Sequence, residues 1–299
     1  MLKRILTALV LIPLVLLLVL RGPLMVLALV AALFALLGVQ EFLALMRRYS
    51  VEPFNKATFV FVGLFFLLLA ISSGGERTPT LTTEVFVYTL GLAAALAPFI
   101  FLTVGMERRD LPSIYPSAAA SVFAFVYVAV PLGMLVHLRQ QWRGAFLVIY
   151  LMVVVWAGDI FAYFVGKAVG RHRMAPRISP GKTWEGAAAS LLASVIMGTL
   201  LFSHAPEISQ FLLRWHLIEQ RDGIFALQKP ALLPTLLLSA GLNIAAQLGD
   251  LVESAIKRGA GVKDSGSLLP GHGGILDRVD ALLFATPLLW FYGAWQVMQ

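Results

Sequence analysis

The chain has 299 residues, of which 59% are hydrophobic and 13% are charged, and its mean hydropathy is +0.85. Soluble domains carry about 25% charged residues, so this composition excludes a soluble globular protein and indicates an integral membrane protein. There is no cysteine, which excludes disulfides and thiolate chemistry. The net charge of +7 is ascribed to membrane topology and lipid contact, and no nucleic-acid partner is expected, because no basic run carries interleaved aromatic residues.

The N-terminal stretch MLKRILTALVLIPLVLLLVL resembles a signal peptide, with Lys3 and Arg4 before an apolar core. It lacks a small-residue cleavage site, since Arg21, Gly22 and Pro23 lead directly into another apolar run. We therefore expect a retained signal anchor.

Nine apolar segments are long enough, or nearly long enough, to cross a bilayer, which takes about 20 helical residues. They are 5–20, 24–46, 57–73, 84–104, 114–137, 145–166, 184–202, 231–251 and 279–297. With the N-terminus inside, most of the 23 Lys and Arg residues fall in inner segments, as the positive-inside rule requires. The sequence therefore predicts one all-α membrane domain over residues 1–299, with about nine transmembrane helices, a cytoplasmic N-terminus and a periplasmic C-terminus.

The two halves of this domain differ in polarity. Residues 1–140 read as scaffold, and Glu41, the ionisable group near the inner end of the second span, is expected to pair with Arg47 or Arg48 at the membrane interface. The second half, 145–297, contains two polar loops, 167–183 and 252–278. The predicted topology puts both loops on the cytoplasmic face, the compartment that contains nucleotides.

The first polar cluster begins inside the sixth span with Asp159. A carboxylate within a membrane is costly, so Asp159 is a candidate functional residue; the alternative is a bond to a neighbouring helix. Tyr163 and Lys167 follow at i+4 and i+8, on roughly the same helix face. These three residues therefore form a polar line toward the cytoplasm.

The segment SPGKT, from Ser179 to Thr183, is not a nucleotide P-loop, because no strand precedes it and Pro176 stands where the earlier glycine would be. It does put Lys182 and Thr183 at the N-terminus of the span beginning at 184. Free backbone N–H groups and the helix dipole favour a phosphate there. Glu185 is explained equally well by a functional role and by an ordinary carboxylate in the first turn of a helix.

The second polar cluster runs from 247 to 280 and holds carboxylates on two predicted helices. The polar residues of the first helix share one face: Asp250, Glu253, Ser254 and Lys257. Asp277 and Asp280 share a face at the start of the second helix. The intervening loop is rich in glycine and serine, so its backbone can approach a ligand and present N–H groups. This arrangement suits a metal ion with phosphates; the alternative is a loop with ordinary solvated charges.

The motifs resemble the signature of the phosphatidate cytidylyltransferases (CDP-diacylglycerol synthases). The main motif reads Ser254-x-x-Lys257-Arg258, Lys263-Asp264, Gly266, Leu269-Pro270-Gly271-His272-Gly273-Gly274 and Asp277-Arg278-x-Asp280. Two upstream stretches also resemble the family: Asp159-x-x-Ala162-Tyr163-x-x-Gly166-Lys167 and Ile178-Ser179-Pro180-x-Lys182-Thr183-Trp184-Glu185-Gly186. The chain departs at Gly181, where many members have lysine or asparagine, so that position is given no role.

The resemblance implies the transfer of a cytidylyl group from CTP to phosphatidic acid, giving CDP-diacylglycerol and pyrophosphate. It implies a Mg²⁺-dependent enzyme of phospholipid biosynthesis in the bacterial inner membrane, with its active site facing the cytoplasm. A homodimer and a second, monovalent cation (K⁺) beside the Mg²⁺ belong to the same expectation. The implied metal ligands are Asp250, Asp277 and Asp280.

Charge neutralisation is the chemistry that these residues can supply. A phosphate oxygen of the lipid is already ionised, so it attacks without a general base, and transfer depends on positioning and electrostatics. The predicted catalytic residues are Asp250, Asp277, Asp280 and Lys257. The predicted substrate-binding residues are Lys167, Ser179, Lys182, Thr183, Ser254, Arg258, Lys263, Asp264, His272, Gly273 and Arg278. Further candidates are Asp159, Tyr163 and Glu253. For His272, a phosphate contact and a loop-ordering role are equally supported.

Two other functions remain open from the residues. A CTP-dependent kinase of a lipid alcohol needs the same ions and cations but attacks the γ-phosphate, and it releases CDP where cytidylyl transfer releases pyrophosphate. A secondary transporter could use Asp159 and Asp250 as ion relays, although the absence of an internal repeat weakens that interpretation. The closely spaced aspartate quartet of the CDP-alcohol phosphotransferases is absent.

Overall fold

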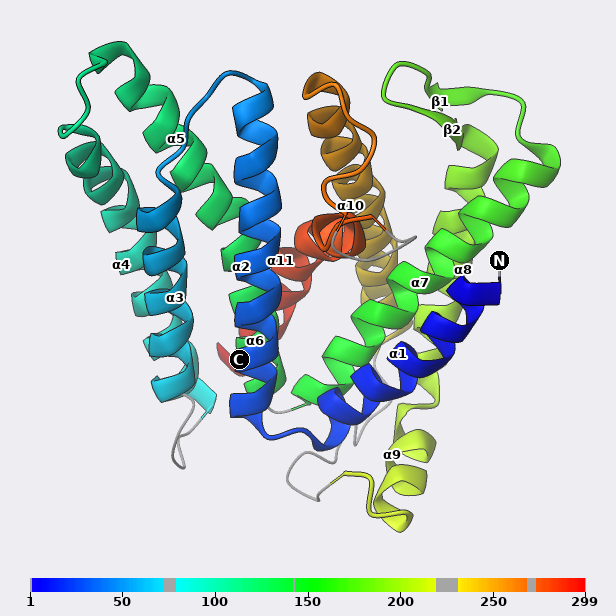
Figure 1. Cartoon of the computed structure of the whole chain (residues 1–299). Helices are drawn as coiled ribbons and strands as arrows, with labels where there is room; N and C mark the ends of the chain where they lie inside the picture. Colours follow the sequence, from blue (N-terminus) through cyan, green and yellow to red (C-terminus); the bar gives the residue numbers. More distant parts are fainter. Residues whose placement is uncertain (1, 73–78, 142, 219–230, 268–272, 299) are drawn as a thin grey trace.

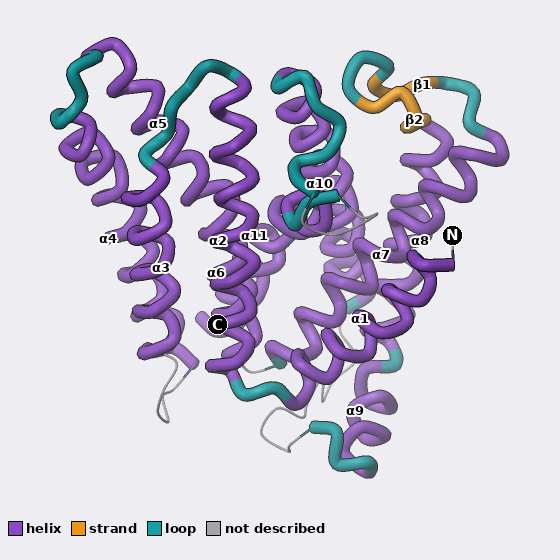
Figure 2. Tube along the Cα trace, in the orientation of Figure 1, coloured by secondary structure: helices purple, strands orange, loops and turns teal. Residues whose placement is uncertain are grey.

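The computed structural model describes residues 2–72, 79–141, 143–218, 231–267 and 273–298. Within these ranges the chain is a bundle of helices with one two-stranded hairpin (Figures 1 and 2). In an α-helix the backbone N–H and C=O groups bond to one another, so a sequence this apolar is expected to form helices in a membrane. The prediction of an all-α membrane fold is confirmed in this coarse form.

The first half of the chain forms six helices and two short helical turns. They are α1 (Leu2–Arg21), α2 (Leu24–Arg48), α3 (Asn55–Ser72), α4 (Pro79–Gly105), the 3₁₀ turn Leu111–Ser113, α5 (Ile114–Ala124), the π-helical turn Phe125–Ala129 and α6 (Val130–Gln140). The predicted span 114–137 is therefore interrupted by a wide turn just before Pro131. Proline has no N–H to continue the helix ladder, and such turns commonly absorb the break.

The second half forms the hairpin and the remaining helices. They are α7 (Gly144–Val169), β1 (Arg173–Ala175), β2 (Ser179–Thr183), α8 (Trp184–Ser203), α9 (Ala205–Arg214), α10 (Leu232–Gly259) and α11 (Leu276–Met298). The strands pair antiparallel, with Arg173 opposite Thr183 and Ala175 opposite Ser179. The sequence predicts only a loop over 167–183, so the hairpin is a correction to that expectation.

Seven helices within the described ranges are long and apolar enough to cross a membrane: Leu24–Arg48, Asn55–Ser72, Leu81–Gly105, Leu111–Gln140, Gly144–Val169, Trp184–Ser203 and Leu232–Gly259. These correspond to seven of the nine predicted spans. The other two predicted spans, 5–20 and 279–297, coincide with α1 and α11. The count of nine stays a prediction.

The connections fall at two opposite ends of the bundle (Figure 1). The link from α2 to α3, the link from α4 to α5, the β1–β2 hairpin and the C-terminal end of α10 lie at one end. Helix α9 lies at the other end. The two polar regions of the second half therefore share an end, as the predicted topology requires. After α10 the chain turns back, so that α11 begins within the bundle and its residue Leu276 is fully buried.

The core of the first half consists mainly of interlocking aromatic rings. Phe125 is fully buried, and the ring centres of Phe61 and Phe65 lie 4.9 and 5.2 Å from its own, both edge-on. The ring centres of Phe42 on α2 and of Tyr127 lie 5.8 Å apart. Edge-to-face contacts of this kind add to packing beyond their buried area. They pack α2 and α3 against the π-helical turn that precedes α6.

Candidate active site

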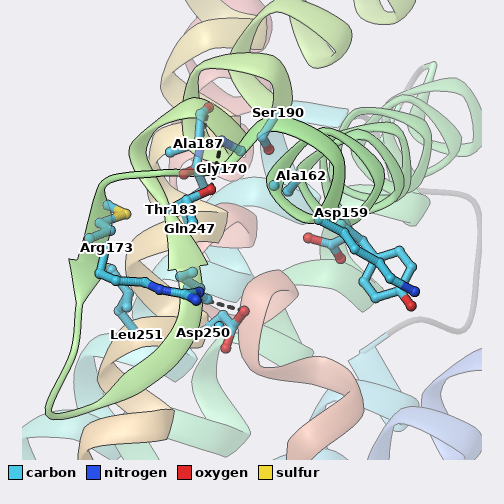
Figure 3. A pocket seen from close by; sticks show the side chains of 17 residues that line it. Asp159, Ala162, Gly170, Arg173, Thr183, Ala187, Ser190, Gln247, Asp250 and Leu251 are labelled. Carbon is cyan, nitrogen blue, oxygen red and sulfur yellow. Dashed lines mark hydrogen bonds and ion pairs between the residues drawn. The ribbon is translucent and has the colours of Figure 1, made fainter.

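A cavity of about 620 Å³ opens between α7, the β1–β2 hairpin, α8 and α10 (Figure 3). Its wall includes two carboxylates, Asp159 and Asp250, and three cations, Lys167, Arg173 and Lys182. Much of the remaining wall consists of small residues from α7, from the residue after it and from α8: Ala162, Gly166, Gly170, Gly186 and Ala187. A cavity of this size with both signs of charge is suited to a polar ligand that carries several charges.

A ladder of polar side chains holds the three helices around the cavity at fixed spacing. Asn243 of α10 donates to the hydroxyls of Ser190 and Ser194 on α8, at 2.9 and 2.8 Å. The Ser194 hydroxyl in turn donates to the Val154 carbonyl of α7 at 2.6 Å. A Cβ atom at Gly158 would lie 2.5 Å from the Asn243 amide nitrogen. Glycine there lets α7 approach α10 closely, as is usual where membrane helices associate through small and polar residues.

Lys182 and Asp250 form an ion pair across the mouth of the cavity, with 2.7 Å between Nζ and Oδ2. Lys182 belongs to β2 and Asp250 belongs to α10. The hydroxyl of Ser254, also on α10, donates to Oδ1 of Asp250 at 3.3 Å. The two charged side chains remain 26% and 39% exposed. The predicted polar stripe on α10 is confirmed by the Ser254 contact one turn from Asp250.

Asp159 of α7 lies across the cavity from Asp250 (Figure 3). Its charge interacts with those of Asp250 and Lys182. It makes no hydrogen bond with any residue of the described ranges. The alternative that Asp159 bonds a neighbouring helix is therefore not supported, and its carboxylate is available to a ligand. Tyr163 and Lys167 also line the cavity, and the Lys167 ammonium lies 5.9 Å from the Tyr163 ring centre.

The hairpin ends in the cap of α8. The Thr183 hydroxyl accepts the N–H of Gly186 at 3.1 Å, so Thr183 is the N-cap of α8 and uses one of the N–H groups that the sequence offers to a phosphate. Glu185 accepts from His172 at 2.7 Å. Of the two interpretations of Glu185, this contact supports the structural one: it ties the start of β1 to the start of α8.

Asp277 is the centre of a second group of polar contacts, at the start of α11. Its Oδ1 receives the Lys257 ammonium at 2.5 Å, and its Oδ2 accepts the N–H groups of Gly274 and Ser265 at 2.7 and 3.0 Å. Burial by itself would raise the pKa of Asp277, which precedes the apolar stretch 279–297, but the Lys257 ammonium and these N–H groups hold that pKa below its ordinary value. Asp277 is therefore a carboxylate anion near neutral pH.

Lys257 also reaches Glu253, at 2.6 Å, so one ammonium group bridges a carboxylate from each of α10 and α11. The Glu253 side chain is completely buried. Removing one partner from a buried ion pair costs far more than a surface pair contributes. Glu253 and Lys257 thus join the two helices as well as lying in the site.

Asp280 lies between the two groups. Its charge interacts with those of Asp250 and Asp159 beside the cavity, and also with that of Lys257. Its side chain accepts the N–H of Ala281 at 2.8 Å. Through Asp280, the carboxylates that the sequence assigns to one site do lie in one region of the structure.

The remaining predicted site residues are more scattered. Arg258 donates to the carbonyls of Ile178 and Val262, at 3.3 and 3.2 Å, and so links α10 to the hairpin. Ser179 belongs to β2 and does not line the cavity. Lys263, Asp264 and Arg278 are exposed. Gly273 has φ +77°, and a Cβ there would lie 2.6 Å from Asp277 Oδ2, so only glycine fits. His272 lies outside the described residues.

Glu41 is the functional candidate that sequence reasoning missed. Arg47 pairs with Glu52 instead, with 3.8 Å between Nε and Oε2. The prediction that Glu41 pairs with Arg47 at the membrane interface is therefore wrong. Glu41 is 9% exposed and accepts hydrogen bonds from the Ser265 hydroxyl and from the N–H groups of Ile275 and Leu276. The signal available in the sequence was a carboxylate placed deep in an apolar span, a pattern that favours a specific partner.

The sequence profile of the Cytidylyltransferase family matches residues 2–295, nearly the whole chain. The chain belongs to the cytidylyltransferase family. The family resemblance carried by the motif from Ser254 to Asp280 is thereby confirmed. Because the match begins at residue 2, membership includes the apolar first half as well as the motif-bearing second half.

Several curated relatives of this cytidylyltransferase are phosphatidate cytidylyltransferases. The protein of Brucella abortus biovar 1 (strain 9-941) is 37% identical over 206 residues, which are 69% of this chain and 65% of the relative. That of Bacillus subtilis (strain 168) is 39% identical over 168 residues, 54% and 55% of the two chains. That of Haemophilus influenzae is 34% identical over 175 residues, 58% and 55% of the two chains. The chain thus spans 65% or less of the length of these relatives.

The carboxylates of this cytidylyltransferase fit a hard divalent cation by their chemistry. Mg²⁺ takes oxygen ligands, commonly one or two carboxylates with phosphates and waters. Asp159 and Asp250 line the cavity, and the charge of Asp280 interacts with the charges of both. Among the described residues, no group of three or more His, Asp or Glu side chains is arranged so that it could hold a metal ion. Asp277 faces Lys257, so the assignment of the ligands Asp250, Asp277 and Asp280 stays a prediction.

Proposed function

We propose that the protein transfers the cytidylyl group of CTP to phosphatidic acid, giving CDP-diacylglycerol and pyrophosphate. The observation that carries this proposal is the charged cavity between α7, the hairpin and α10, in a chain of the cytidylyltransferase family. It is supported by the curated relatives named phosphatidate cytidylyltransferase. The proposal includes a site in the bacterial inner membrane that opens to the cytoplasm, nine spans and a homodimer.

The cations of the cavity would bind the phosphates. Lys167, Arg173 and Lys182 line the cavity, and in this role they hold the CTP triphosphate and neutralise the departing pyrophosphate. Lys182, paired with Asp250, is the one placed to exchange a protein carboxylate for a phosphate oxygen. Bringing together two polyanions requires this neutralisation more than it requires a base, because the lipid phosphate is already ionised.

The carboxylates would hold the divalent cation. Asp250 and Asp280 are assigned as its ligands together with Asp277, and Asp159 faces the same space. A bound Mg²⁺ would supply positive charge against the negative charge that develops at the α-phosphate. A second, monovalent cation (K⁺) would be expected among the same oxygens. The residues of the chain orient the phosphates in line.

The kinase and transporter alternatives predict different products. Cytidylyl transfer releases pyrophosphate and keeps CMP on the lipid, whereas a lipid kinase releases CDP. The proposed test supplies the purified protein in detergent with CTP labelled at the α-phosphate, phosphatidic acid and Mg²⁺. Label in the lipid and release of pyrophosphate are expected; CDP, or no turnover away from a sealed membrane, would contradict the proposal.

The metal requirement is tested in the same assay. EDTA should stop the incorporation of label into lipid, and excess Mg²⁺ should restore it, because the aspartates and the triphosphate are all anions and repel one another without a cation between them. Full incorporation in EDTA would rule out the metal role assigned to Asp250, Asp277 and Asp280.

A further inference from the structure

Glu41 caps a helix that lies more than 230 positions later in the chain. The first N–H groups of an α-helix have no partner within the helix, and a nearby Ser, Thr, Asp or Asn usually accepts one of them. In α11 the carboxylate of Glu41 takes this part: Ile275 N–H donates to Oε1 at 3.0 Å, and Leu276 N–H donates to Oε2 at 2.8 Å. The orientation of the first turn of α11 therefore depends on a side chain of α2.

The glycines around Glu41 show that the contact is close on both sides. A Cβ atom at Gly266 would lie 2.4 Å from Oε1 of Glu41, and one at Gly274 would lie 2.3 Å from Oε2. Real Cβ atoms do not approach an oxygen this closely. The backbone on both sides of the undescribed stretch 268–272 thus closes directly onto one carboxylate group.

Ser265 joins Glu41 to Asp277. Its hydroxyl lies 2.9 Å from Oε2 of Glu41 and 3.0 Å from Oδ2 of Asp277. Asp277 follows Leu276 directly, and Asp280 lies one helical turn further along. A displacement of Glu41 would therefore reach both acidic residues of α11, through the hydroxyl of Ser265 and through the backbone of Leu276.

A second contact from α2 holds the end of α10. The Tyr49 hydroxyl donates to the Ile256 carbonyl at 2.8 Å, one residue before Lys257. A Cβ at Gly259 would lie 1.9 Å from that hydroxyl oxygen. Glu41 and Tyr49 lie two helical turns apart at the end of α2, so α2 sets the end of α10 and the start of α11 relative to each other.

We propose that Glu41 is a positioning residue, which fixes the start of α11 so that Asp277 and Asp280 face the site. This inference rests on the proposed function for its kinetic effect, but its structural effect can be measured without turnover. Partners that orient an acidic ligand typically change activity about 10- to 100-fold when they are removed, although they touch no substrate.

The test compares Glu41→Gln with Glu52→Gln. The amide keeps the shape of Glu41 but offers one oxygen in place of two, so one of the N–H groups of Ile275 and Leu276 loses its acceptor. We expect kcat to fall about 10- to 100-fold, with the KM for CTP changed less than about twofold, and a higher Mg²⁺ concentration at half-maximal rate. Glu52 is an exposed carboxylate of the same half, and Glu52→Gln should leave all three values unchanged.

Amide hydrogen exchange provides the readout that does not depend on turnover. In the protein without substrate or Mg²⁺, Glu41→Gln should make the amide of at least one of Ile275 and Leu276 exchange about tenfold faster or more, while amides in the middle of α7 keep their protection. Protected amides at both positions, or a kcat equal to that of the wild type, would overturn the inference. If Glu41→Gln does not fold, Glu41→Asp, which keeps the charge on a shorter side chain, is judged by the same two criteria.

The wild-type protein separates this inference from the proposed function. If the wild type makes no CDP-diacylglycerol, the proposed function fails, and the exchange rates alone decide whether Glu41 holds α11. A second variant, Gly266→Ala, should lower kcat in the wild-type background, because its methyl group would lie 2.4 Å from Oε1 of Glu41 and displace the carboxylate. In Glu41→Ala the same change should have little further effect, and additive losses would contradict a shared mechanism.

Discussion

The two halves of the molecule are built from different interactions. The helices α1 to α6 pack through apolar and aromatic side chains such as Phe61, Phe65 and Phe125, whereas α7, α8 and α10 are joined by hydroxyl and amide groups. Apolar packing needs no partner of a given chemistry, but a polar ladder holds helices in one register. The comparison teaches that the half which surrounds the charged cavity is also the half whose spacing is set by hydrogen bonds.

The division is not complete, because two side chains of the apolar half reach into the charged one. These are Glu41 and Tyr49, at the end of α2. Glu41 accepts a hydrogen bond at the start of α11, and Tyr49 donates one near the end of α10. The apolar half therefore supports the helix ends that carry the acidic residues at these two points, and His137 of α6 accepts a further hydrogen bond from Trp290 of α11. Four predictions test this division, in order of decreasing expected effect.

The largest effect should follow from Asp277→Asn. The substitution removes a charge held by Lys257 and two backbone N–H groups, and turnover should fall about 10³-fold, the upper range for loss of one electrostatic contact. The measurement is labelled CDP-diacylglycerol formed per minute by the purified protein, with its melting temperature as a check on folding. Asp110→Asn, on an exposed link of the apolar half, is the control. Near-normal turnover would remove Asp277 from the site.

Phe125→Ala should affect stability and leave substrate binding unchanged. Phe125 is fully buried between Phe61 and Phe65, and truncation leaves a cavity that costs about 3 kcal/mol. We expect a lower melting temperature in detergent, with the KM for CTP within about twofold of the wild type. A clear rise in KM at unchanged stability would break the comparison, since it would mean that the aromatic core shapes the cavity.

Lys182→Ala should show the opposite pattern. The variant removes a cation from the cavity wall and leaves Asp250 without its ion pair, and a hydrogen bond to a charged group contributes about 1.5–3 kcal/mol. We expect the KM for CTP to rise roughly tenfold, and the KM for phosphatidic acid to change less. Lys56→Ala, an exposed lysine of the other half, should change neither. A larger rise in the KM for phosphatidic acid than in the KM for CTP would mean that Lys182 binds the lipid phosphate and not the triphosphate.

The smallest effect should come from Asn243→Ala in the polar ladder. Its amide joins two serines of α8, and hydrogen bonds between membrane helices contribute about 0.6 kcal/mol on average and about 1.7 at most. We expect a drop of a few degrees in melting temperature and a loss of about two- to fivefold in kcat/KM, because the cavity walls shift. Unchanged kcat/KM in a destabilised variant would show that the ladder holds the fold without setting the cavity.

Local patterns predicted those parts of the site that lie within one helix. The stripe of Asp250, Ser254 and Lys257 follows from helical periodicity, and the structure pairs Ser254 with Asp250. The sequence placed Lys182 at the start of the seventh span, but only the fold shows that it faces Asp250, 68 positions later. The approach of Asp159 to Asp250 is likewise a matter of helix packing, which periodicity does not specify.

The fold was predictable in class and less so in detail. Hydropathy locates long apolar helices without ambiguity, since a spanning helix needs about 20 apolar residues. It could not locate the hairpin of Arg173–Ala175 and Ser179–Thr183, because three- and five-residue strands carry no clear alternation. Glu41 was misassigned because Arg47 and Arg48 are neighbours in sequence, whereas its actual donors, Ser265, Ile275 and Leu276, are neighbours only in space.

The hydroxyl of Ser265 has a single hydrogen, yet it lies within bonding distance of the carboxylates of Glu41 and Asp277. Only one of them can receive that hydrogen at a time. Each carboxylate that goes without it still accepts two backbone N–H groups, Ile275 and Leu276 for Glu41, and Gly274 and Ser265 for Asp277. The hydrogen can therefore switch sides while the main chain stays in place, and neither carboxylate is left without a donor.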